Sequence, residues 1–324
     1  MSDACTAQMI RTAAQRIAGH ARRTPLLSSP FLDHLAQRRI LVKPECLQHT
    51  GSFKFRGAFN ALSAMDPATR THGVIAFSSG NHAQGVAYAA KLHDTSAVII
   101  MPSDAPQLKI DNTRALGAEV ILYDRDTEDR DDIGARLSTD RNLTLIKPFD
   151  DPQVIAGQGT TGLEIAEDAK ALGITNAEVL VCCGGGGLTS GIALALEADA
   201  PGFRTRPVEP AGFDDVARSL ATGAIQRNAA TSGNICDAII TPQPGDLTWP
   251  ILHRRCGPGL TVTEDQCLRA MREAFLRLKL VAEPGGAAAL AAALYSPQVE
   301  ADTVIVTISG GNVDPAMFTR ALTL

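Results

Sequence analysis

Short apolar runs alternate with longer stretches of helical periodicity along most of the chain. The runs at 74–77, 97–101 and 119–123 are rich in Val, Ile and Leu, and segments with helical spacing follow them. Strands that alternate with helices form parallel sheets, because each helix returns the chain to the start of the next strand. The pattern therefore predicts an α/β fold in this part of the chain.

A second set of apolar runs lies on both sides of this block, at 40–45, 178–183, 206–208 and 303–308. The acidic segment 150–152 ends in Pro and is typical of a linker between the two sets. We therefore predict two parallel-type sheets with flanking helices. A small domain of residues 73–149 is inserted in a larger domain that consists of residues 1–72 and 150–324.

Composition and charge exclude several classes of function. The 324 residues carry a net charge of -5 with both signs interspersed, so a nucleic-acid partner is not expected. The sequence shows no apolar run that could span a membrane and no secretory signal at its start, so no membrane partner is expected. Seven cysteines without CxxC spacing are typical of reduced thiols, which predicts a cytoplasmic location.

Lys54 is the first candidate for chemistry. It stands between Phe53 and Phe55 in a segment that glycines bracket on both sides. Apolar neighbours disfavour the ammonium form, so the amine of such a lysine can act as nucleophile or base near neutral pH. Taken alone, the residue also fits a lysine whose stem covers apolar surface while its head reaches water.

Four consecutive glycines follow the apolar run 178–183 and precede a helical segment. Glycines allow several backbone N–H groups to turn toward one anion, and the helix adds its positive end. No Gly-Lys-Ser/Thr follows, which argues against Mg-ATP, and the dinucleotide-binding pattern is incomplete. The alternative is a tight turn without a ligand. We predict a phosphate cradle formed by Gly184, Gly185, Gly186 and Gly187.

A second polar turn lies between the run 74–77 and the next helix. It presents hydroxyls, an amide and backbone N–H groups, which suit an anion such as a carboxylate. The alternative is an ordinary helix cap, and a lone histidine here is more often structural than catalytic. The residues of this candidate carboxylate site are Ser78, Ser79, Gly80, Asn81 and His82.

Two further clusters complete the set. Ser309 follows the last strand, where a hydroxyl can bond a ring nitrogen of a ligand or belong to a plain turn. Glu209, Asp214 and Asp215 flank a Pro-Ala-Gly turn, and carboxylates so placed either bind a hard cation or favour a helix N-terminus. An amine, a phosphate cradle, a carboxylate site and a hydroxyl at strand ends together match pyridoxal phosphate bound as a Schiff base.

At this point the sequence resembles the serine/threonine dehydratase and serine racemase family, the fold type II pyridoxal-phosphate enzymes. The resemblance implies a fold like that of the tryptophan synthase β-subunit. Its motifs appear in family order over nearly the whole chain, at Gly51-Ser52-Phe53-Lys54-Phe55-Arg56-Gly57-Ala58, Ser78-Ser79-Gly80-Asn81-His82-Ala83-Gln84-Gly85, Gly184–Gly187, Glu209-Pro210, Asp214-Asp215, Glu283-Pro284-Gly285-Gly286-Ala287 and Ser309-Gly310-Gly311-Asn312.

The resemblance implies a role for each residue of the cofactor site. Lys54 would hold the cofactor covalently and then move the α-proton of the substrate. Phe53 would pack near the ring, Asn81 would bond the ring's 3-hydroxyl, and Ser309 would bond the ring nitrogen. The phosphate would lie on the four glycines at 184–187.

Substrate and cation roles follow from the same resemblance. Ser79 and His82, with the neighbouring turn, would hold the carboxylate of a small amino-acid substrate. In the racemase branch, the residue that matches Ser79 is also the acid/base on the opposite face of the ring. Glu209, the Phe213 carbonyl and Asp215 match the family's site for a divalent cation such as Mg²⁺, although Phe213 is bulky for that position.

The implied activity is dehydration of L-threonine or L-serine to a 2-oxo acid and ammonia by a homodimer. Arg218 and Arg227 lie downstream of the acidic cluster, and either would recognise a second carboxylate, which keeps a 3-hydroxyaspartate dehydratase open. Serine racemase and a dehydratase of hydroxyectoine breakdown are further alternatives. A cysteine-synthase-like β-replacement and a non-catalytic sensor that binds the cofactor fit less well.

Overall fold

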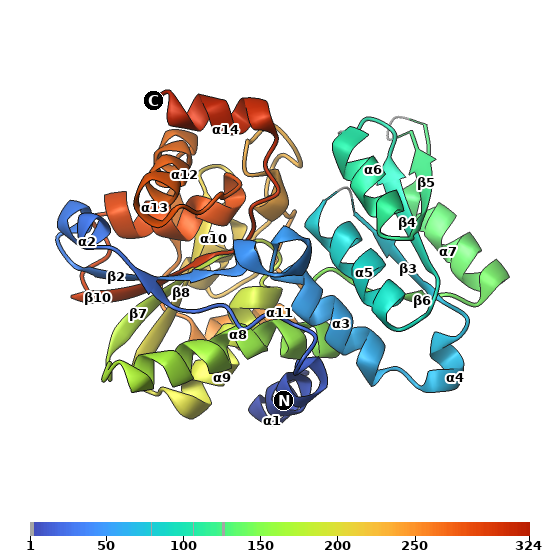
Figure 1. Ribbon diagram of the computed structural model, residues 1–324, viewed down its shortest axis with the longest axis horizontal. Helices are drawn as coiled ribbons and strands as arrows, with labels where there is room; N and C mark the ends of the chain where they lie inside the picture. Colours follow the sequence, from blue (N-terminus) through green and yellow to red (C-terminus); the bar gives the residue numbers. More distant parts are fainter. Residues whose placement is uncertain (1–2, 79, 106, 125–126) are drawn as a thin grey trace.

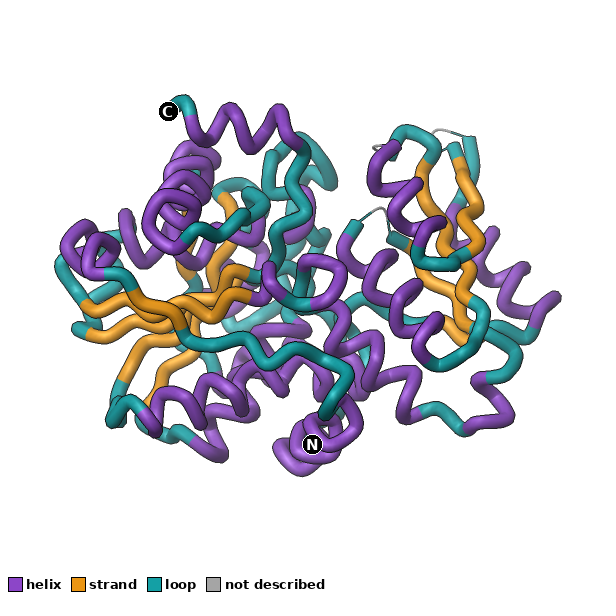
Figure 2. Tube along the Cα trace, viewed as in Figure 1, coloured by secondary structure: helices purple, strands orange, loops and turns teal. Residues whose placement is uncertain are grey.

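The computed structural model describes residues 3–78, 80–105, 107–124 and 127–324. Two sheets of mostly parallel strands lie in adjacent layered units, and helices flank each sheet (Figures 1 and 2). The predicted α/β fold class is confirmed. The domain boundaries at residues 73 and 149 stay a prediction, and all four strands of the smaller sheet fall between them.

The smaller sheet has the strand order β5-β4-β3-β6, and all its pairs are parallel. Successive residues of a strand point to opposite faces, so Val74 and Ala76 pack with helix α5 while Ile75 packs with helix α7. The elements of this unit are β3 (Val74–Phe77), α5 (Asn81–Leu92), β4 (Ala97–Pro102), α6 (Gln107–Ala115), β5 (Glu119–Tyr123), α7 (Arg130–Arg141) and β6 (Thr144–Leu145).

The larger sheet has the order β1-β2-β10-β7-β8-β9, and only β1 and β2 pair in antiparallel fashion. Leu180 and Val306 face the core formed with α12 and α13, whereas Val179 and Ile305 face α8 and α9. Its strands are β1 (Leu27–Ser28), β2 (Arg39–Pro44), β7 (Ala177–Cys182), β8 (Phe203–Pro210), β9 (Leu260–Val262) and β10 (Thr303–Ile308).

Helices complete the larger unit. They are α1 (Ala7–Ile17), α2 (Pro30–Ala36), α3 (Lys54–Ala64), α4 (Pro67–Arg70), α8 (Pro152–Ala171), α9 (Gly187–Asp199), α10 (Asp215–Thr222), α11 (Thr248–Arg255), α12 (Glu264–Leu278), α13 (Ala288–Tyr295) and α14 (Pro315–Leu322), with 3₁₀ turns at Glu45–Leu47, His49–Gly51, Asp237–Ile239 and Gly285–Ala287. None of the described helices is long and apolar enough to cross a membrane.

One strand is longer than the sequence predicts. Strand β8 runs over Phe203–Pro210, whereas the sequence predicts a strand that starts at Arg206 and leads into Glu209-Pro210. The charged Arg204 interrupts the apolar pattern before that start. Arg206 itself is buried, and its guanidinium pairs with the Glu178 carboxylate on β7 at 3.3 Å, so a cross-strand ion pair allows an arginine inside this strand.

The two units meet where strands end. Strand β3 leads into Ser78, β7 into the glycines from Gly184, and β10 into Ser309. Helix α3 lies between the units, because it packs on both α5 and α8 (Figure 1). The carboxyl ends of parallel strands are where α/β folds bind ligands, so this junction is the place for a site.

Candidate active site

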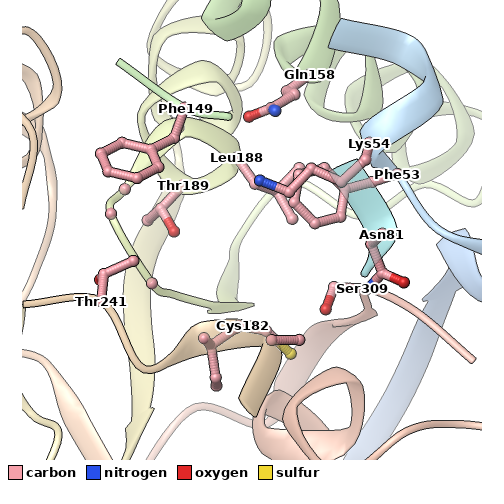
Figure 3. A pocket seen from close by; sticks show the side chains of 16 residues that line it. Phe53, Lys54, Asn81, Phe149, Gln158, Cys182, Leu188, Thr189, Thr241 and Ser309 are labelled. Carbon is pink, nitrogen blue, oxygen red and sulfur yellow. The ribbon is translucent and has the colours of Figure 1, made fainter. Parts of the chain in front are cut away.

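A cavity opens at this junction (Figure 3). Its walls come from the start of α3, the start of α5, the loop before α8, the loop between β7 and α9, and the end of β10. The residues that line it are Phe53, Lys54, Asn81, Phe149, Gln158, Cys182, Gly184, Gly185, Gly186, Gly187, Leu188, Thr189, Ala238, Ile239, Thr241 and Ser309. Predicted residues from four separate segments therefore share one cavity.

Lys54 is the first residue of α3, and the residues just before it are hydrogen-bonded to the end of β10. Phe53 N–H donates to the Ser309 carbonyl at 3.1 Å, and Ser52 forms an isolated bridge with Gly310. Lys54 Nζ lies 5.1 Å from the centre of the Phe53 ring and donates to the Pro148 carbonyl at 2.7 Å. The lysine amine is therefore held at the cavity wall by backbone contacts.

The electrostatics of Lys54 agree with the sequence interpretation. The residue is partly accessible from the cavity, while the surrounding protein removes its amine from bulk water. This desolvation lowers the pKa of Lys54 to about 8, against a smaller opposing effect of the Glu283 carboxylate. An appreciable share of the amine is therefore unprotonated near neutral pH.

The glycine loop is closely surrounded. Gly186 has a φ of 94°, which favours glycine, and it caps helix α9. A Cβ on Gly185 would lie 2.3 Å from the Phe149 ring, and one on Gly187 would lie 2.7 Å from Gln158 Oε1. Side chains are therefore excluded from the loop, and the N–H groups at the start of α9 stay open toward the cavity.

The turn before α5 is described except for Ser79, which lies outside the described residues. The Ser78 hydroxyl accepts from Gly80 N–H at 3.1 Å. Asn81 Nδ2 donates to Glu283 Oε1 at 2.6 Å, and Asn81 Oδ1 accepts from Asn312 Nδ2 at 2.7 Å. Among the described residues, these partners fix the amide and leave one N–H of Nδ2 available at the cavity wall.

His82 has a different environment from the one its motif suggests. Its ring is buried, and Nε2 lies 2.8 Å from the Ile146 carbonyl, which requires a proton on Nε2. Burial, and then the charge of Lys54, lower the pKa of His82 to about 3. The ring is therefore neutral, and its Nδ1, which has no partner among the described residues, is an acceptor that cannot donate to a carboxylate.

The acidic cluster lies apart from the cavity lining. Glu209 accepts from Val216 N–H at 3.0 Å and from Ala217 N–H at 2.7 Å, at the start of α10. Asp215 Oδ1 accepts from Asn228, while the buried Oδ2 has no partner among the described residues. Burial is the largest cause that raises the pKa of Glu209 and that of Asp215, the latter to about 6.

The described residues contain no cluster of three or more His, Cys, Asp or Glu side chains arranged for a metal ion. A cation at this place would therefore need the two carboxylates together with a backbone oxygen, such as that of the buried Phe213. The same contacts also satisfy the alternative of a helix N-terminus stabilised by acids.

The two arginines proposed for a second carboxylate lie elsewhere. Arg218 pairs with Asp214 at 3.2 Å and also donates to Asn228, and Arg227 donates to Gln243 at 3.0 Å. Neither lines the Lys54 cavity. The guanidinium of Arg218 is engaged on and beside α10, and that of Arg227 at Gln243, so the structure gives no support for either as a second carboxylate site at Lys54.

The cavity suits the predicted cofactor on its own geometry. It combines a desolvated amine, a glycine loop at a helix N-terminus and the Ser309 hydroxyl, and several buried polar atoms in its wall lack partners among the described residues. The model for pyridoxal-phosphate-dependent enzymes matches residues 17–310. The chain belongs to this family.

Curated proteins and solved structures of the same family are similar to this chain over nearly its whole length. An L-threo-3-hydroxyaspartate ammonia-lyase from Pseudomonas sp is 45% identical over 303 residues, which cover 93% of either chain. The crystal structure of a T.th. threonine deaminase shares 44% identity, with a TM-score of 0.89 over 95% of this chain and 98% of that one. Maize serine racemase shares 35% identity, with a TM-score of 0.91 over 99% and 97%. This pyridoxal-phosphate enzyme is an ammonia-lyase, as the sequence predicts.

Sequence reasoning missed several residues of the cavity wall, namely Phe149, Gln158, Cys182, Thr189 and Thr241. Gln158 lies between Gly157 and Gly159 in a helix, and a polar side chain within so glycine-rich a helix is the one signal that could have singled it out. The others are ordinary core or loop residues in the sequence, and only tertiary packing brings them to the cavity.

Proposed function

We propose that Lys54 binds pyridoxal phosphate covalently and afterwards moves the α-proton of a β-hydroxy amino acid. The observation that carries this proposal is the lysine amine with a pKa of about 8 at the edge of a cavity with a glycine cradle. The cofactor supplies a sink for the electrons that the α-carbon releases. An unprotonated Lys54 amine would take that proton, and the hydroxyl on the β-carbon would then take up a proton and leave as water. A water molecule would finally hydrolyse the released 2-imino acid to the 2-oxo acid and ammonia.

The other cofactor contacts follow from position. Phe53 would pack against the ring, and the free N–H of Asn81 would donate to the 3-hydroxyl. Ser309 offers a neutral hydroxyl at the end of β10, so a ring nitrogen beside it would stay unprotonated. The N–H groups around Gly184, Gly185, Gly186 and Gly187 would bind the phosphate.

The substrate carboxylate would bind at the N-terminus of α5. Backbone N–H groups of Asn81 and His82, with the Ser78 hydroxyl, supply donors there, while the Gly80 N–H orders the turn through its hydrogen bond to Ser78. The neutral His82 ring accepts rather than donates, so we assign the contribution of His82 to its backbone. Ser79 would complete this turn and stand as the acid/base on the far face of the ring.

We further propose that Glu209, the Phe213 carbonyl and Asp215 hold a divalent cation such as Mg²⁺. Support comes from two buried carboxylates with raised pKa values and from Asp215 Oδ2, which has no partner among the described residues. Mg²⁺ should raise the melting temperature of the wild type and leave an Asp215→Ala variant unchanged. An equal effect of Mg²⁺ on both proteins would contradict the cation site.

For the substrate, a 3-hydroxyaspartate is the first candidate. The 45% identity to an L-threo-3-hydroxyaspartate ammonia-lyase supports it. L-Threonine or L-serine is the second candidate, because Lys54 is the only Lys or Arg among the described residues that line the cavity. An uncharged wall suits a substrate with a single carboxylate.

A substrate screen separates these candidates. The enzyme is incubated with L-serine, L-threonine, D-serine and the threo and erythro isomers of 3-hydroxyaspartate, and both 2-oxo acid and product chirality are measured. We expect 2-oxo acid from a 3-hydroxyaspartate with the highest kcat/KM. Racemisation that outpaces elimination on every substrate would contradict the dehydratase assignment in favour of a racemase.

We also propose that the enzyme is a homodimer and that residues 73–149 form a separate small domain. The family resemblance supports the homodimer, and the four-stranded sheet between these residues supports the domain. Light scattering should give twice the monomer mass, and limited proteolysis should cut near residues 73 and 149 before it cuts within either unit.

A further inference from the structure

Three side chains in the cavity wall bury polar atoms without any partner among the described residues. They are both amide atoms of Gln158 and the hydroxyls of Thr189 and Thr241. A buried amide or hydroxyl without a hydrogen bond costs on the order of 1–3 kcal/mol, so proteins seldom leave three around one cavity. Such atoms point to a ligand that accepts hydrogen bonds, and Figure 3 shows them at the end of the cavity near Phe149.

The backbone of helix α8 is closely packed on both sides of Gln158. Gln158 lies on α8 between glycines whose added Cβ atoms would lie 2.5 Å from the Arg56 carbonyl, at Gly157, and 2.9 Å from the Gly191 carbonyl, at Gly159. Helix α8 is thus pressed against α3 and α9, and the Gln158 side chain is fully buried. Its Oε1 lies 2.7 Å from the place of a Gly187 Cβ, so the amide abuts the last glycine of the cradle.

Thr189 extends the same cradle along α9. It is the third residue of that helix and is fully buried. The N–H groups of a helix's first turn have no acceptor within the helix, and they share this end of the cavity with the Thr189 hydroxyl. Gln158 from α8 and Thr189 from α9 therefore add side-chain donors to the backbone donors of the glycines.

The cavity wall offers few positive charges to balance a phosphate, so uncharged hydrogen-bond donors become important. A phosphate ester carries close to two negative charges, and proteins usually meet it with Arg or Lys. The only Lys or Arg among the described residues of the cavity wall is Lys54, whose amine is reserved for chemistry. The phosphate must then be held by helix N–H groups and by uncharged side chains.

We propose that Gln158 and Thr189 are phosphate-binding residues, which donate from Nε2–H and Oγ1–H to the phosphate oxygens of the cofactor. The proposal rests on the proposed placement of the phosphate at residues 184–187. The two side chains would then add to the affinity for the cofactor that the N–H groups of the glycines provide.

The test compares pyridoxal phosphate with pyridoxal, which lacks the phosphate, on the apoenzyme. Gln158→Met and Thr189→Val keep the approximate shape of each side chain and remove its donor. Thr161→Val is the matched control, because the Thr161 hydroxyl on α8 is also buried without a partner among the described residues but does not line the cavity. Thr189→Ser restores the hydroxyl and should restore binding.

We expect each of the first two variants to weaken the affinity for pyridoxal phosphate roughly 10-fold or more, and the affinity for pyridoxal less than about 2-fold. Thr161→Val should change neither value. Inorganic phosphate should raise the melting temperature of the wild-type apoenzyme and of Thr161→Val, but not that of the Gln158→Met/Thr189→Val double variant.

Two outcomes would overturn the proposal. Unchanged affinity for pyridoxal phosphate in both variants would mean that the side chains bind buried water, and equal weakening for the two ligands would mean that they act through packing. If the wild type itself binds both ligands equally and ignores inorganic phosphate, the phosphate is not on the glycines, and the proposed function fails at that point as well.

Discussion

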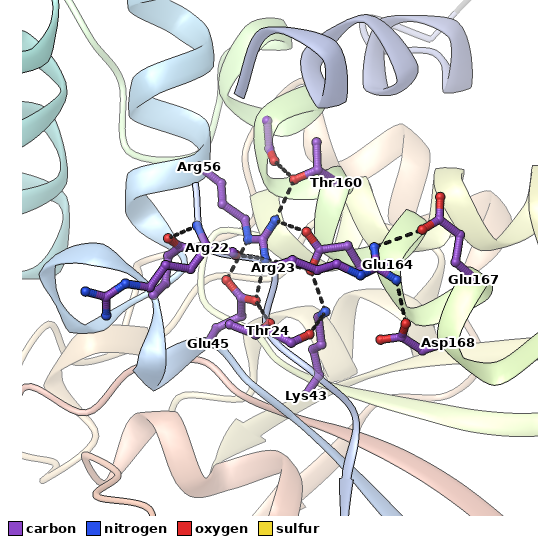
Figure 4. Close-up of polar contacts among 12 residues, drawn as sticks. Arg22, Arg23, Thr24, Lys43, Glu45, Arg56, Thr160, Glu164, Glu167 and Asp168 are labelled. Carbon is purple, nitrogen blue, oxygen red and sulfur yellow. Dashed lines mark hydrogen bonds and ion pairs between the residues drawn. The ribbon is translucent and has the colours of Figure 1, made fainter. Parts of the chain in front are cut away.

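Helix α3 separates two buried polar regions that differ in how their charges are paired. On one side lies the Lys54 cavity of Figure 3, and on the other lies the cluster around Arg56 in Figure 4. Arg56 makes forked contacts with Glu45 at 2.7 and 2.9 Å and with Glu164 at 2.7 and 2.8 Å. Lys43 completes this cluster through Glu164 at 2.5 Å.

The pKa values record the same contrast. Burial alone would lower the pKa of Arg56, but the carboxylates of Glu45 and Glu164 outweigh it and raise that pKa. Burial lowers the pKa of Lys43, against opposition from Glu164 and Glu45. For Lys54 the opposing carboxylate, Glu283, acts through its charge while its Oε1 accepts from Asn81, and the pKa of Lys54 falls to about 8.

The partners of the two buried amines distinguish a lysine that stabilises the fold from a lysine that can react. Protein surrounds both Lys43 and Lys54 and removes their amines from bulk water. Lys43 donates to a carboxylate and a backbone carbonyl, whereas Lys54 donates only to the Pro148 carbonyl among the described residues. Full pairing fixes the fold, and incomplete pairing leaves an amine free to react. The two regions should therefore respond to mutation in opposite ways.

Lys54→Ala should give the largest effect on activity. We expect turnover to fall by about 10³-fold or more, because both the covalent attachment and the proton acceptor are lost. The visible absorbance of the covalently held cofactor should disappear, while the urea midpoint of the apoenzyme changes little. Lys43→Met is the comparison variant, and it should keep the absorbance while it loses stability. Retention of the chromophore in Lys54→Ala would remove Lys54 from its assigned role.

Arg56→Met should give the largest effect on stability. Removal of the guanidinium leaves Glu45 and Glu164 buried with insufficient partners, which costs about 3–5 kcal/mol in comparable buried pairs. Urea unfolding of the apoenzyme measures this loss. Arg56→Lys keeps the charge without the planar fork and should lose less. A variant that unfolds like the wild type but fails to turn over would show that the cluster serves chemistry instead of structure.

The sequence predicts one of these regions far better than the other. Lys54 and the glycines at 184–187 are visible because local chemistry marks them, with phenylalanines around a lysine and four glycines in a row. Arg56 meets Glu164 across 108 residues, and nothing in the local pattern of either residue indicates the partner. The protonation of His82 and the hydrogen bonding of the Gln158 amide likewise depend on residues that are distant in sequence. Local motifs therefore do not predict them.

Gly85→Ala should give a moderate effect that is confined to activity. A Cβ there would lie 3.1 Å from the Lys54 carbonyl carbon, so α5 must shift by a few tenths of an ångström relative to the reactive lysine. We expect kcat/KM to fall roughly 10-fold, because small displacements of reacting groups are costly. The gain in helix propensity of up to about 1 kcal/mol should offset much of the lost stability.

The matched control for this variant is Gly57→Ala on α3. Its Cβ would lie 2.9 Å from the Val154 carbonyl on α8, so it presses on a neighbour other than α5. Gly57→Ala should lose more stability than Gly85→Ala, and Gly85→Ala should lose more kcat/KM than Gly57→Ala. If one variant loses more of both stability and kcat/KM than the other, the contacts of α3 with α5 and with α8 do not serve activity and stability separately.

The smallest perturbation is a change of pH on the wild-type apoenzyme. Only the unprotonated amine reacts with acetic anhydride, so labelling of a lysine rises with pH through its own pKa. Lys54 should therefore show a midpoint near pH 8, because its folded pKa lies below the ordinary lysine value of 10.5. Lys43 should stay unlabelled over the same range, since it is fully buried and holds Glu164. Peptide mass spectrometry after brief labelling reads both sites in one sample. Lys54 labelling that begins only near pH 10 would show an amine as well solvated as a surface lysine, and the contrast between the two buried lysines would then rest on geometry alone.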